Sequence, residues 1–364
     1  MENNKKNKHN ILFISSFGDL AGGGQRSLLL LLKNLDKSRF MPFVLVPESG
    51  ELEKELLKLG IEVIKLSFPR IRSMHIFSIL DAGLKLSRIV RDNGIDIIHT
   101  DSTRETFYAG IVRIFLKVPV ILHLRVSDKV RWIDRIVYKL TDQMIAVSKS
   151  LTARFEGIDT QNKINIVYNS VDLDEFKPIA NNNAKKKLLR IGCFGRIVKR
   201  KGIEILIKAV KDLEGDLSLL IMGSGEDQYL AELKKLAEAD KRIQFKPYKQ
   251  NVRDEINSVD IVVLPSIDGE GLSRIIIEAM ALGKIAIASD NPENLEALGY
   301  DLKEFGFKTG DAQDLAKIIK KIQSNRALQD SLGLISRKRA ENFFDARKNT
   351  RLIENIYDSI LGEK

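Results

Sequence analysis

Two glutamates stand eight positions apart in the stretch EGLSRIIIEAMALG, residues 270–283. The isoleucines between them predict a buried helix that begins near Leu272 or Ser273, after the strand-like run DIVVLPS. At about 1.5 Å of rise per residue, the two carboxylates lie roughly 12 Å apart. Carboxylate pairs that act on one glycosidic bond stand about 5 to 9.5 Å apart, so Glu270 and Glu278 are not expected to form such a pair.

A separation of that length suits an elongated polyanion bound along the start of the helix. The first N–H groups of a helix lack partners within it and attract phosphates. A sugar, a diphosphate and a ribose laid end to end would place the sugar at Glu270 and the ribose at Glu278. The phosphates would lie against the N–H groups of Gly271, Leu272 and Ser273. The alternative is a pair of solvated glutamates stabilised by the helix dipole.

Glycines stand between strand-like and helical runs at two other places in the second half, with cations at the first of them. In CFGRIVKRKGIEILIKAV, Arg196 and Lys201 precede a helix, where a guanidinium and an ammonium group would neutralise a diphosphate. The run LLIMGSGEDQYL contributes Gly223 and Ser224. Because such loops meet at one edge of a parallel sheet, we expect them to line one crevice. A solvated basic loop is the alternative.

A third glycine loop lies in the first half, where ILFISSFGD runs into LAGGGQRS. Gly23 and Gly24 would let the backbone approach a ligand at a helix start. The dinucleotide fingerprint is absent, because Ser27 fills its third glycine position. A flexible connecting loop is the alternative interpretation.

Short apolar runs alternate with helical stretches through both halves, which is the βαβ rhythm of parallel sheets. At 364 residues the chain exceeds the size of one ordinary domain. We predict an α/β protein with two Rossmann-like domains, at 10–180 and 181–344, joined by the linker FKPIANNNAKKKL. A disordered polar tail at 1–9 would precede them, and a helix at about 345–364 could pack back on the first domain.

The composition indicates an intracellular protein with anionic partners. The net charge is +10, the lone cysteine permits no disulfide, and no run of 18 apolar residues would span a membrane. Between Arg104 and Lys139 the chain is basic and carries Trp132, which predicts an amphipathic helix on anionic lipid, or else a core helix with a solvated basic face. No recognition helix or aromatic-rich basic strand indicates nucleic acid.

Four of these segments, in order, resemble one family. EGLSRIIIEAM resembles the E-x7-E signature of glycosyltransferase family 4, whose retaining enzymes have the GT-B fold of two facing Rossmann-like domains with an interdomain cleft. GRIVKRKG is similar to the family's G-R-x4-K-G segment, GGGQR to its N-terminal glycine loop, and VYNSVDLDEFKP to its segment entering the linker. The resemblance covers most of the chain from Ile11 to about Pro292.

The resemblance implies roles for individual residues. Arg196 and Lys201 would bind the donor diphosphate, Glu278 the ribose and Glu270 the transferred sugar. Gly23 and Gly24 would approach the phosphate and the acceptor.

Two histidines of the first half also match family positions. His123, in VPVILHLRVSD, matches a histidine near the transferred sugar, although a lone histidine after an apolar strand is commonly structural. His99 matches the first histidine of an H-x-H pair whose second member is Asp101 here, so it is either a packed or an acceptor-side residue. The DLD run at Asp172 is interpreted as a turn and helix cap rather than a metal motif.

The resemblance implies a cytoplasmic enzyme, at the inner face of the cell membrane, that moves a hexose-type sugar from a nucleotide-diphosphate sugar to a glycan or lipid-linked acceptor. Surface polysaccharide or glycolipid synthesis would be its pathway. No metal or other cofactor is expected, because cations and a helix start serve the diphosphate. The alternatives are a sugar-nucleotide epimerase of the same shape and a non-catalytic sugar-nucleotide-binding partner.

Overall fold

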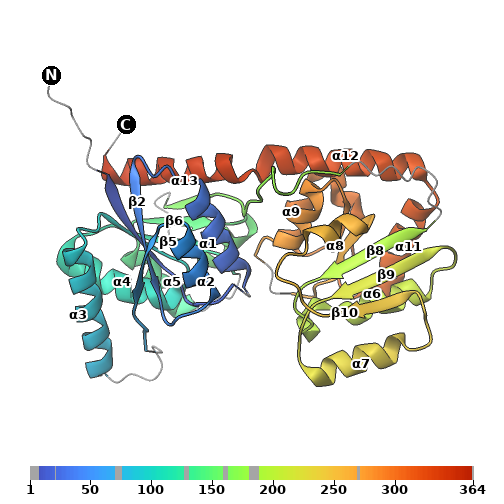
Figure 1. Ribbon diagram of the computed structural model, residues 1–364, viewed down its shortest axis with the longest axis horizontal. Helices are drawn as coiled ribbons and strands as arrows, with labels where there is room; N and C mark the ends of the chain where they lie inside the picture. Colours follow the sequence, from blue (N-terminus) through green and yellow to red (C-terminus); the bar gives the residue numbers. More distant parts are fainter. Residues whose placement is uncertain are drawn as a thin grey trace. The chain divides into compact units, whose positions relative to one another are not determined.

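The computed structural model of the chain describes residues 8–20, 22–69, 76–126, 131–158, 163–179, 188–268 and 271–362. The chain divides into two compact units (Figure 1). The N-terminal unit comprises residues 1–169 and 346–364, and the C-terminal unit comprises residues 170–345. Of the expected disordered tail at 1–9, residues 1–7 lie outside the described residues, whereas His9 already begins a strand.

The division at 169 corrects the boundary expected at 180. Val171 forms a bridge with Asp345, and its N–H donates to the carbonyl of Phe344 at 2.8 Å. The Arg337 guanidinium also donates to the carbonyl of Phe176, at 2.9 Å. Residues 170–178 are therefore held by the end of the C-terminal unit, although the last three of them already belong to the linker-like run that suggested the boundary.

The N-terminal unit is built on a parallel sheet of seven strands in the order β3-β2-β1-β4-β5-β6-β7. Its strands are almost wholly apolar because helices cover both faces. One core lies between the sheet and α1, α2 and α13, and the other lies between the sheet and α3 and α4. The strands are β1 (His9–Ile14), β2 (Phe40–Val46), β3 (Glu62–Lys65), β4 (Ile97–Thr100), β5 (Val120–Leu124), β6 (Gln143–Ala146) and β7 (Ile164–Ile166), and the helices are α1 (Gly23–Asn34), α2 (Glu51–Lys58), α3 (Ile76–Asp92), α4 (Thr103–Leu116), α5 (Arg131–Leu140), η2 (Ser150–Phe155) and α13 (Ala346–Leu361).

The C-terminal unit repeats this plan with a parallel sheet of six strands in the order β10-β9-β8-β11-β12-β13. Its helix α9 packs on α12, and α6 packs on α7 and α11. The strands are β8 (Leu189–Phe194), β9 (Leu217–Met222), β10 (Ile243–Lys246), β11 (Ile261–Leu264), β12 (Ile285–Ser289) and β13 (Gly306–Phe307), and the helices are η3 (Lys199–Lys201), α6 (Ile203–Lys211), α7 (Asp227–Ala237), α8 (Arg253–Ser258), α9 (Arg274–Ala281), α10 (Pro292–Leu298), η4 (Tyr300–Phe305), α11 (Ala312–Gln323) and α12 (Arg326–Phe343).

Both sheets reverse their strand order at one point, between β1 and β4 in the N-terminal unit and between β8 and β11 in the C-terminal unit. In open α/β sheets, ligands bind outside the carboxyl ends of the strands at such a switch point. We therefore expect ligand-binding residues in the loops after β1, β4, β8 and β11. Within the described ranges, no helix combines the length and the apolar character that crossing a bilayer requires.

Candidate active site

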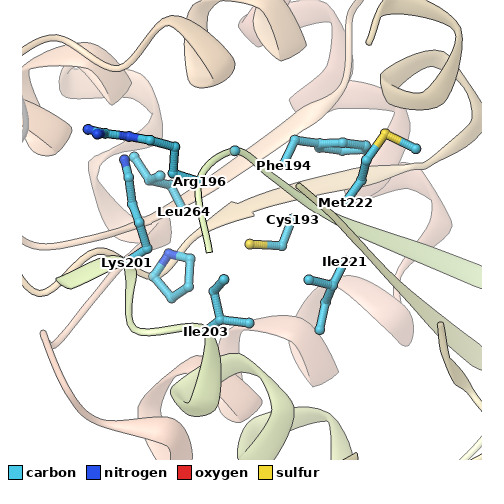
Figure 2. Close-up of a pocket in the computed structure, with 10 residues that line it drawn as sticks. Cys193, Phe194, Arg196, Lys201, Ile203, Ile221, Met222 and Leu264 are labelled. Atoms are coloured by element: carbon cyan, nitrogen blue, oxygen red, sulfur yellow. The ribbon is translucent and has the colours of Figure 1, made fainter. Parts of the chain in front are cut away.

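A pocket lies at the carboxyl ends of β8, β9 and β11. It therefore occupies the switch point of the C-terminal sheet. Arg196 and Lys201 belong to its lining, and Figure 2 shows their side chains on the same side of it. Cys193 forms part of the wall; burial raises the pKa of its thiol to about 12, so the thiol stays protonated at neutral pH.

The two cations are positioned by a short loop and one helical turn. Gly195 directly follows β8 and has a φ of +134°, a conformation that residues with side chains rarely adopt. The turn η3 then ends at Gly202, whose φ is +58° and at which a Cβ would stand 2.3 Å from the carbonyl oxygen of Pro265. Because α6 begins at the next residue, Lys201 lies just ahead of a helix N-terminus, as a diphosphate site requires.

The loop after β9 contacts the loop that carries Arg196 and supports it. A Cβ at Gly223 would lie 1.8 Å from the carbonyl oxygen of Gly195, and the Ile197 N–H donates to the carbonyl of Ser224 at 2.8 Å. Gly223 is therefore required for two loops to touch. We expected Gly223 and Ser224 to bind the donor. In the structure, both residues contact and support the loop that carries Arg196.

The helix that follows β11 buries one of the two glutamates of the opening motif. Glu278 lies on the second turn of α9 with 5% of its surface exposed, and Leu272 and Ser273 are buried just before the helix. Glu270 lies outside the described residues, so its separation from Glu278 stays a prediction.

Arg274 is a partner of Glu278 that the sequence analysis did not single out. Its Nη2 donates to Oε1 of Glu278 at 2.9 Å, and its Nη1 donates to the carbonyl of Ser170 at 3.2 Å. The i, i+4 spacing of opposite charges on a helix was the signal for this pair. The carboxylate of Glu278 is thus held in a fixed orientation on the second turn of α9.

In the N-terminal unit, the glycine loop is partly helical. Gly22 is the N-cap of α1, so Gly23 and Gly24 form its first turn rather than a loop. A Cβ at Gly24 would lie 3.4 Å from Cδ of Arg125. The guanidinium of Arg125 donates to Oδ1 of Asn169 at 3.3 Å, and the hydroxyl of Ser27 donates to the same oxygen at 3.3 Å.

The histidines of β4 and β5 form a buried cluster beside Arg125. Nε2 of His99 lies 3.2 Å from Nδ1 of His123, and Nη2 of Arg125 lies 3.3 Å from that same Nδ1. The hydroxyl of Tyr357, on α13, lies 2.6 Å from Nδ1 of His99. Burial, with help from Arg125, lowers the pKa of His99 to about 3 and holds the pKa of His123 well below its usual value. Both rings are therefore neutral at pH 7.

Asp101 stands where the family pattern has a second histidine. It follows β4, and its Oδ1 accepts from the N–H of Ser16 at 3.2 Å and from the hydroxyl of Ser16 at 2.8 Å. Burial raises the pKa of this carboxyl to about 6, against the opposing effect of Arg125. The carboxylate ties the loop after β1 to the loop after β4, at the switch point of the N-terminal sheet.

The DLD run forms a turn. Oδ1 of Asp172 accepts from the N–H groups of Asp174 and Glu175 at 3.0 and 3.1 Å. The cap expected there does not begin a helix within residues 163–179. Among the described residues, no three histidine, cysteine, aspartate or glutamate side chains gather as a metal site would need.

Comparisons with known proteins agree with the architecture. The N-terminal half matches the family model "Glycosyltransferase Family 4" over residues 21–175, and the following part matches "Glycosyl transferases group 1" over residues 174–339. The chain resembles a glycosyltransferase from Rickettsia africae, with a TM-score of 0.87, 22% identity and coverage of 98% of this chain and 100% of that one. It also resembles Anabaena Alr3699/HepE in complex with UDP and glucose, with a TM-score of 0.82, 20% identity and coverage of 96% and 99%.

The curated relatives that the chain resembles are named as glycosyltransferases. The capsular polysaccharide biosynthesis glycosyltransferase CapM of Staphylococcus aureus is 24% identical over 85% of this chain and 88% of its own length. The UDP-Gal:alpha-D-GlcNAc-diphosphoundecaprenol alpha-1,3-galactosyltransferase of Escherichia coli is 23% identical over 95% and 96%. The chain spans only 62% of another relative, the uncharacterized glycosyltransferase MJ1069 of Methanocaldococcus jannaschii, at 27% identity. Because two adjoining family models together extend from residue 21 to residue 339, the chain belongs to the group 1, family 4 glycosyltransferases, and it shares the GT-B fold of the solved glycosyltransferases that it resembles.

Proposed function

We propose that the protein transfers a hexose-type sugar, with retention of configuration, from a UDP-sugar to a glycan or lipid-linked acceptor in the synthesis of a surface polysaccharide or glycolipid. The observation that carries this proposal is the pocket at the switch point of the C-terminal sheet, lined by Arg196 and Lys201. The solved complexes of HepE with UDP and the diphosphoundecaprenol substrate named for the Escherichia coli relative support the donor and acceptor classes.

In the proposed reaction, the bond between the sugar C1 and the diphosphate oxygen breaks, and its electron pair leaves with the diphosphate. Arg196 and Lys201 neutralise the charge that builds up there, as do the N–H groups of Gly271, Leu272 and Ser273. The acceptor hydroxyl forms the new bond to C1 and gives its proton to the departing phosphate oxygen. No metal ion is needed, because fixed cations and backbone N–H groups serve the leaving group.

The remaining site residues hold the two ends of the donor. Glu278 binds the ribose hydroxyls and Glu270 binds the hydroxyls of the sugar. Backbone atoms near His123 assist the sugar ring as it becomes cationic, and the neutral imidazole donates a hydrogen bond to the sugar. The N-terminal unit, with Gly23 and Gly24 at the start of α1, presents the acceptor.

Thermal unfolding with UDP-, GDP- and ADP-sugars tests the donor assignment. We expect a UDP-sugar at about 100 times its Kd to stabilise the protein by roughly 2.7 kcal/mol.

A transfer assay tests the reaction itself. Labelled sugar should pass to an undecaprenyl-diphosphate-linked acceptor at the same rate with and without EDTA, and NMR of the product should show the anomeric configuration of the donor. An inverted product would contradict retention, and loss of transfer in EDTA would contradict metal independence. Epimerised UDP-sugar, or binding without transfer, would favour the alternative functions.

We also propose that α3 and α5 bring the N-terminal unit to an anionic membrane. Phe77, Leu80 and Leu84, on α3, are 83%, 55% and 61% exposed, and α3 packs on α4, which packs on α5. On α5, Trp132 is 60% exposed and Ile136 is 40% exposed. Exposed basic side chains accompany them, namely Lys85, Arg88 and Arg91 on α3 and Arg135 and Lys139 on α5. Apolar side chains beside basic ones favour binding at a cytoplasmic lipid surface.

The double variant Leu80→Ser, Leu84→Ser is expected to bind vesicles of anionic lipid at least about tenfold more weakly, because each leucine contributes roughly 1.5 to 3 kcal/mol when buried. Binding of the unaltered protein should fall as salt rises. The matched control is Leu57→Ser, Leu352→Ser, whose exposed leucines lie on α2 and α13, over the other face of the sheet. Sedimentation with the vesicles measures the binding. If both variants sediment equally with anionic vesicles, or if the unaltered protein binds neutral vesicles equally well, this surface is not the membrane-binding surface.

A further inference from the structure

The histidine cluster of the N-terminal unit connects the last helix of the chain to two neighbouring strands. Tyr357 comes from α13, His99 from β4 and His123 from β5, and the three side chains have 0%, 4% and 4% of their surfaces exposed. The ring of Tyr357 stands edge-on to Phe40, with centroids 5.5 Å apart, and the ring of His99 lies 5.1 Å from that of Phe13. Packing therefore holds each ring in place.

The contacts of the cluster favour one arrangement of protons. Arginine can only donate, so Nδ1 of His123 accepts from Arg125, and the proton of the neutral ring resides on Nε2. Nε2 of His99 faces the same Nδ1, and a proton on this Nε2 shares the lone pair with Arg125 and avoids two facing lone pairs. The other nitrogen of His99, Nδ1, is then without a proton and accepts from the hydroxyl of Tyr357.

We propose that Tyr357 is a positioning residue that acts through His99 to fix His123 as an Nε2–H donor toward the transferred sugar. This inference rests on the proposed function, in which His123 contacts that sugar. The tautomer of a histidine is set by the bond that its other nitrogen makes. Here that bond of His123 leads to His99, and from His99 to the hydroxyl of Tyr357, which lies 258 positions after His99 in the chain. His99 thereby has a role that its sequence position left open.

Tyr357→Phe tests the relay, because it removes the hydroxyl and keeps the ring that packs on Phe40. Without that donor, His99 can place its proton on Nδ1, and Nε2 then no longer donates to His123. We expect kcat to fall about tenfold, the effect of one lost hydrogen bond, with the KM for the donor unchanged. The matched control is Tyr108→Phe, which removes a hydroxyl from an equally buried tyrosine that donates to the carbonyl of Pro69 at 3.1 Å. The control should leave kcat unaltered.

Nitrogen-15 spectra of the whole protein labelled at its four histidines provide a measurement that does not depend on turnover. Long-range proton–nitrogen correlations should show His99 and His123 protonated at Nε2, and a second tautomer of His99 should appear in Tyr357→Phe. A proton on Nδ1 of His123 in the unaltered protein, or an unchanged kcat in Tyr357→Phe, would overturn the relay. An inactive protein with the expected tautomers would instead count against the proposed function.

Discussion

Replacing Arg196 with alanine is expected to lower kcat by about 10²- to 10³-fold, the usual effect of removing one charge-stabilising donor from an active site. Arg196 lines the pocket at the end of β8 and is itself exposed, so its loss leaves no hole in the core. The melting temperature should therefore stay close to that of the unaltered protein. Steady-state transfer assays and thermal unfolding on the same preparation measure both quantities.

Lys199→Ala is the matched control for this variant. Lys199 lies three residues after Arg196, at the start of η3, and carries the same charge, but it is exposed and does not line the pocket. A general loss of positive charge would slow both variants alike, whereas a diphosphate contact slows only the first. Arg196→Lys should recover part of the rate, because an ammonium group supplies charge without the paired donors of a guanidinium. Wild-type turnover in Arg196→Ala would refute the phosphate role.

Glu278→Ala is expected to have two separate effects. It removes the acceptor proposed for the ribose hydroxyls, which should weaken UDP binding at least about tenfold, because a hydrogen bond to a charged group contributes roughly 1.5 to 3 kcal/mol. It also leaves Arg274, whose side chain is 15% exposed, without its carboxylate partner. Breaking a buried ion pair from one side costs about 3 to 5 kcal/mol, so unfolding of the C-terminal unit should shift to lower urea concentration.

Two further variants separate binding from stability. Glu278→Gln keeps an oxygen that can accept from Arg274, so it should restore much of the stability but not the affinity for UDP. Arg274→Met should lose stability and keep UDP binding, because it removes the structural partner and leaves the carboxylate. Calorimetry that finds equal loss of UDP affinity in Arg274→Met and Glu278→Ala would assign Glu278 to structure rather than to the ribose.

The sequence predicted the GT-B fold and the family correctly, because both depend on local patterns. A strand that is covered on both faces reads as a continuous apolar run, and the loops after such strands carry glycines and cations at fixed offsets. For that reason the sequence alone indicated the pocket residues Arg196 and Lys201. The ion pair of Arg274 and Glu278 could also have been predicted, because the two residues are one helical turn apart. It was missed because only the glutamates were considered.

Other features depend on contacts between distant residues. The domain boundary is set by Val171 and Asp345, which meet although 174 positions separate them. The hydrogen bond between His99 and Tyr357 joins residues 258 positions apart. Gly223 is needed because a backbone carbonyl from another loop occupies the space of its Cβ, and no local pattern records that approach.

The return of α13 to the first sheet determines the order in which this protein can mature on the ribosome. Ile353, Ile356 and Tyr357 complete the core beneath α1, yet they are synthesised after all of residues 170–345. The second unit can therefore finish folding first, although the first unit begins the chain, in contrast to the usual progression from the N-terminus. Nascent chains that stop before α13 would lack the apolar side chains with which Ile353, Ile356 and Tyr357 complete this core, although α1 and α2 would still cover the sheet.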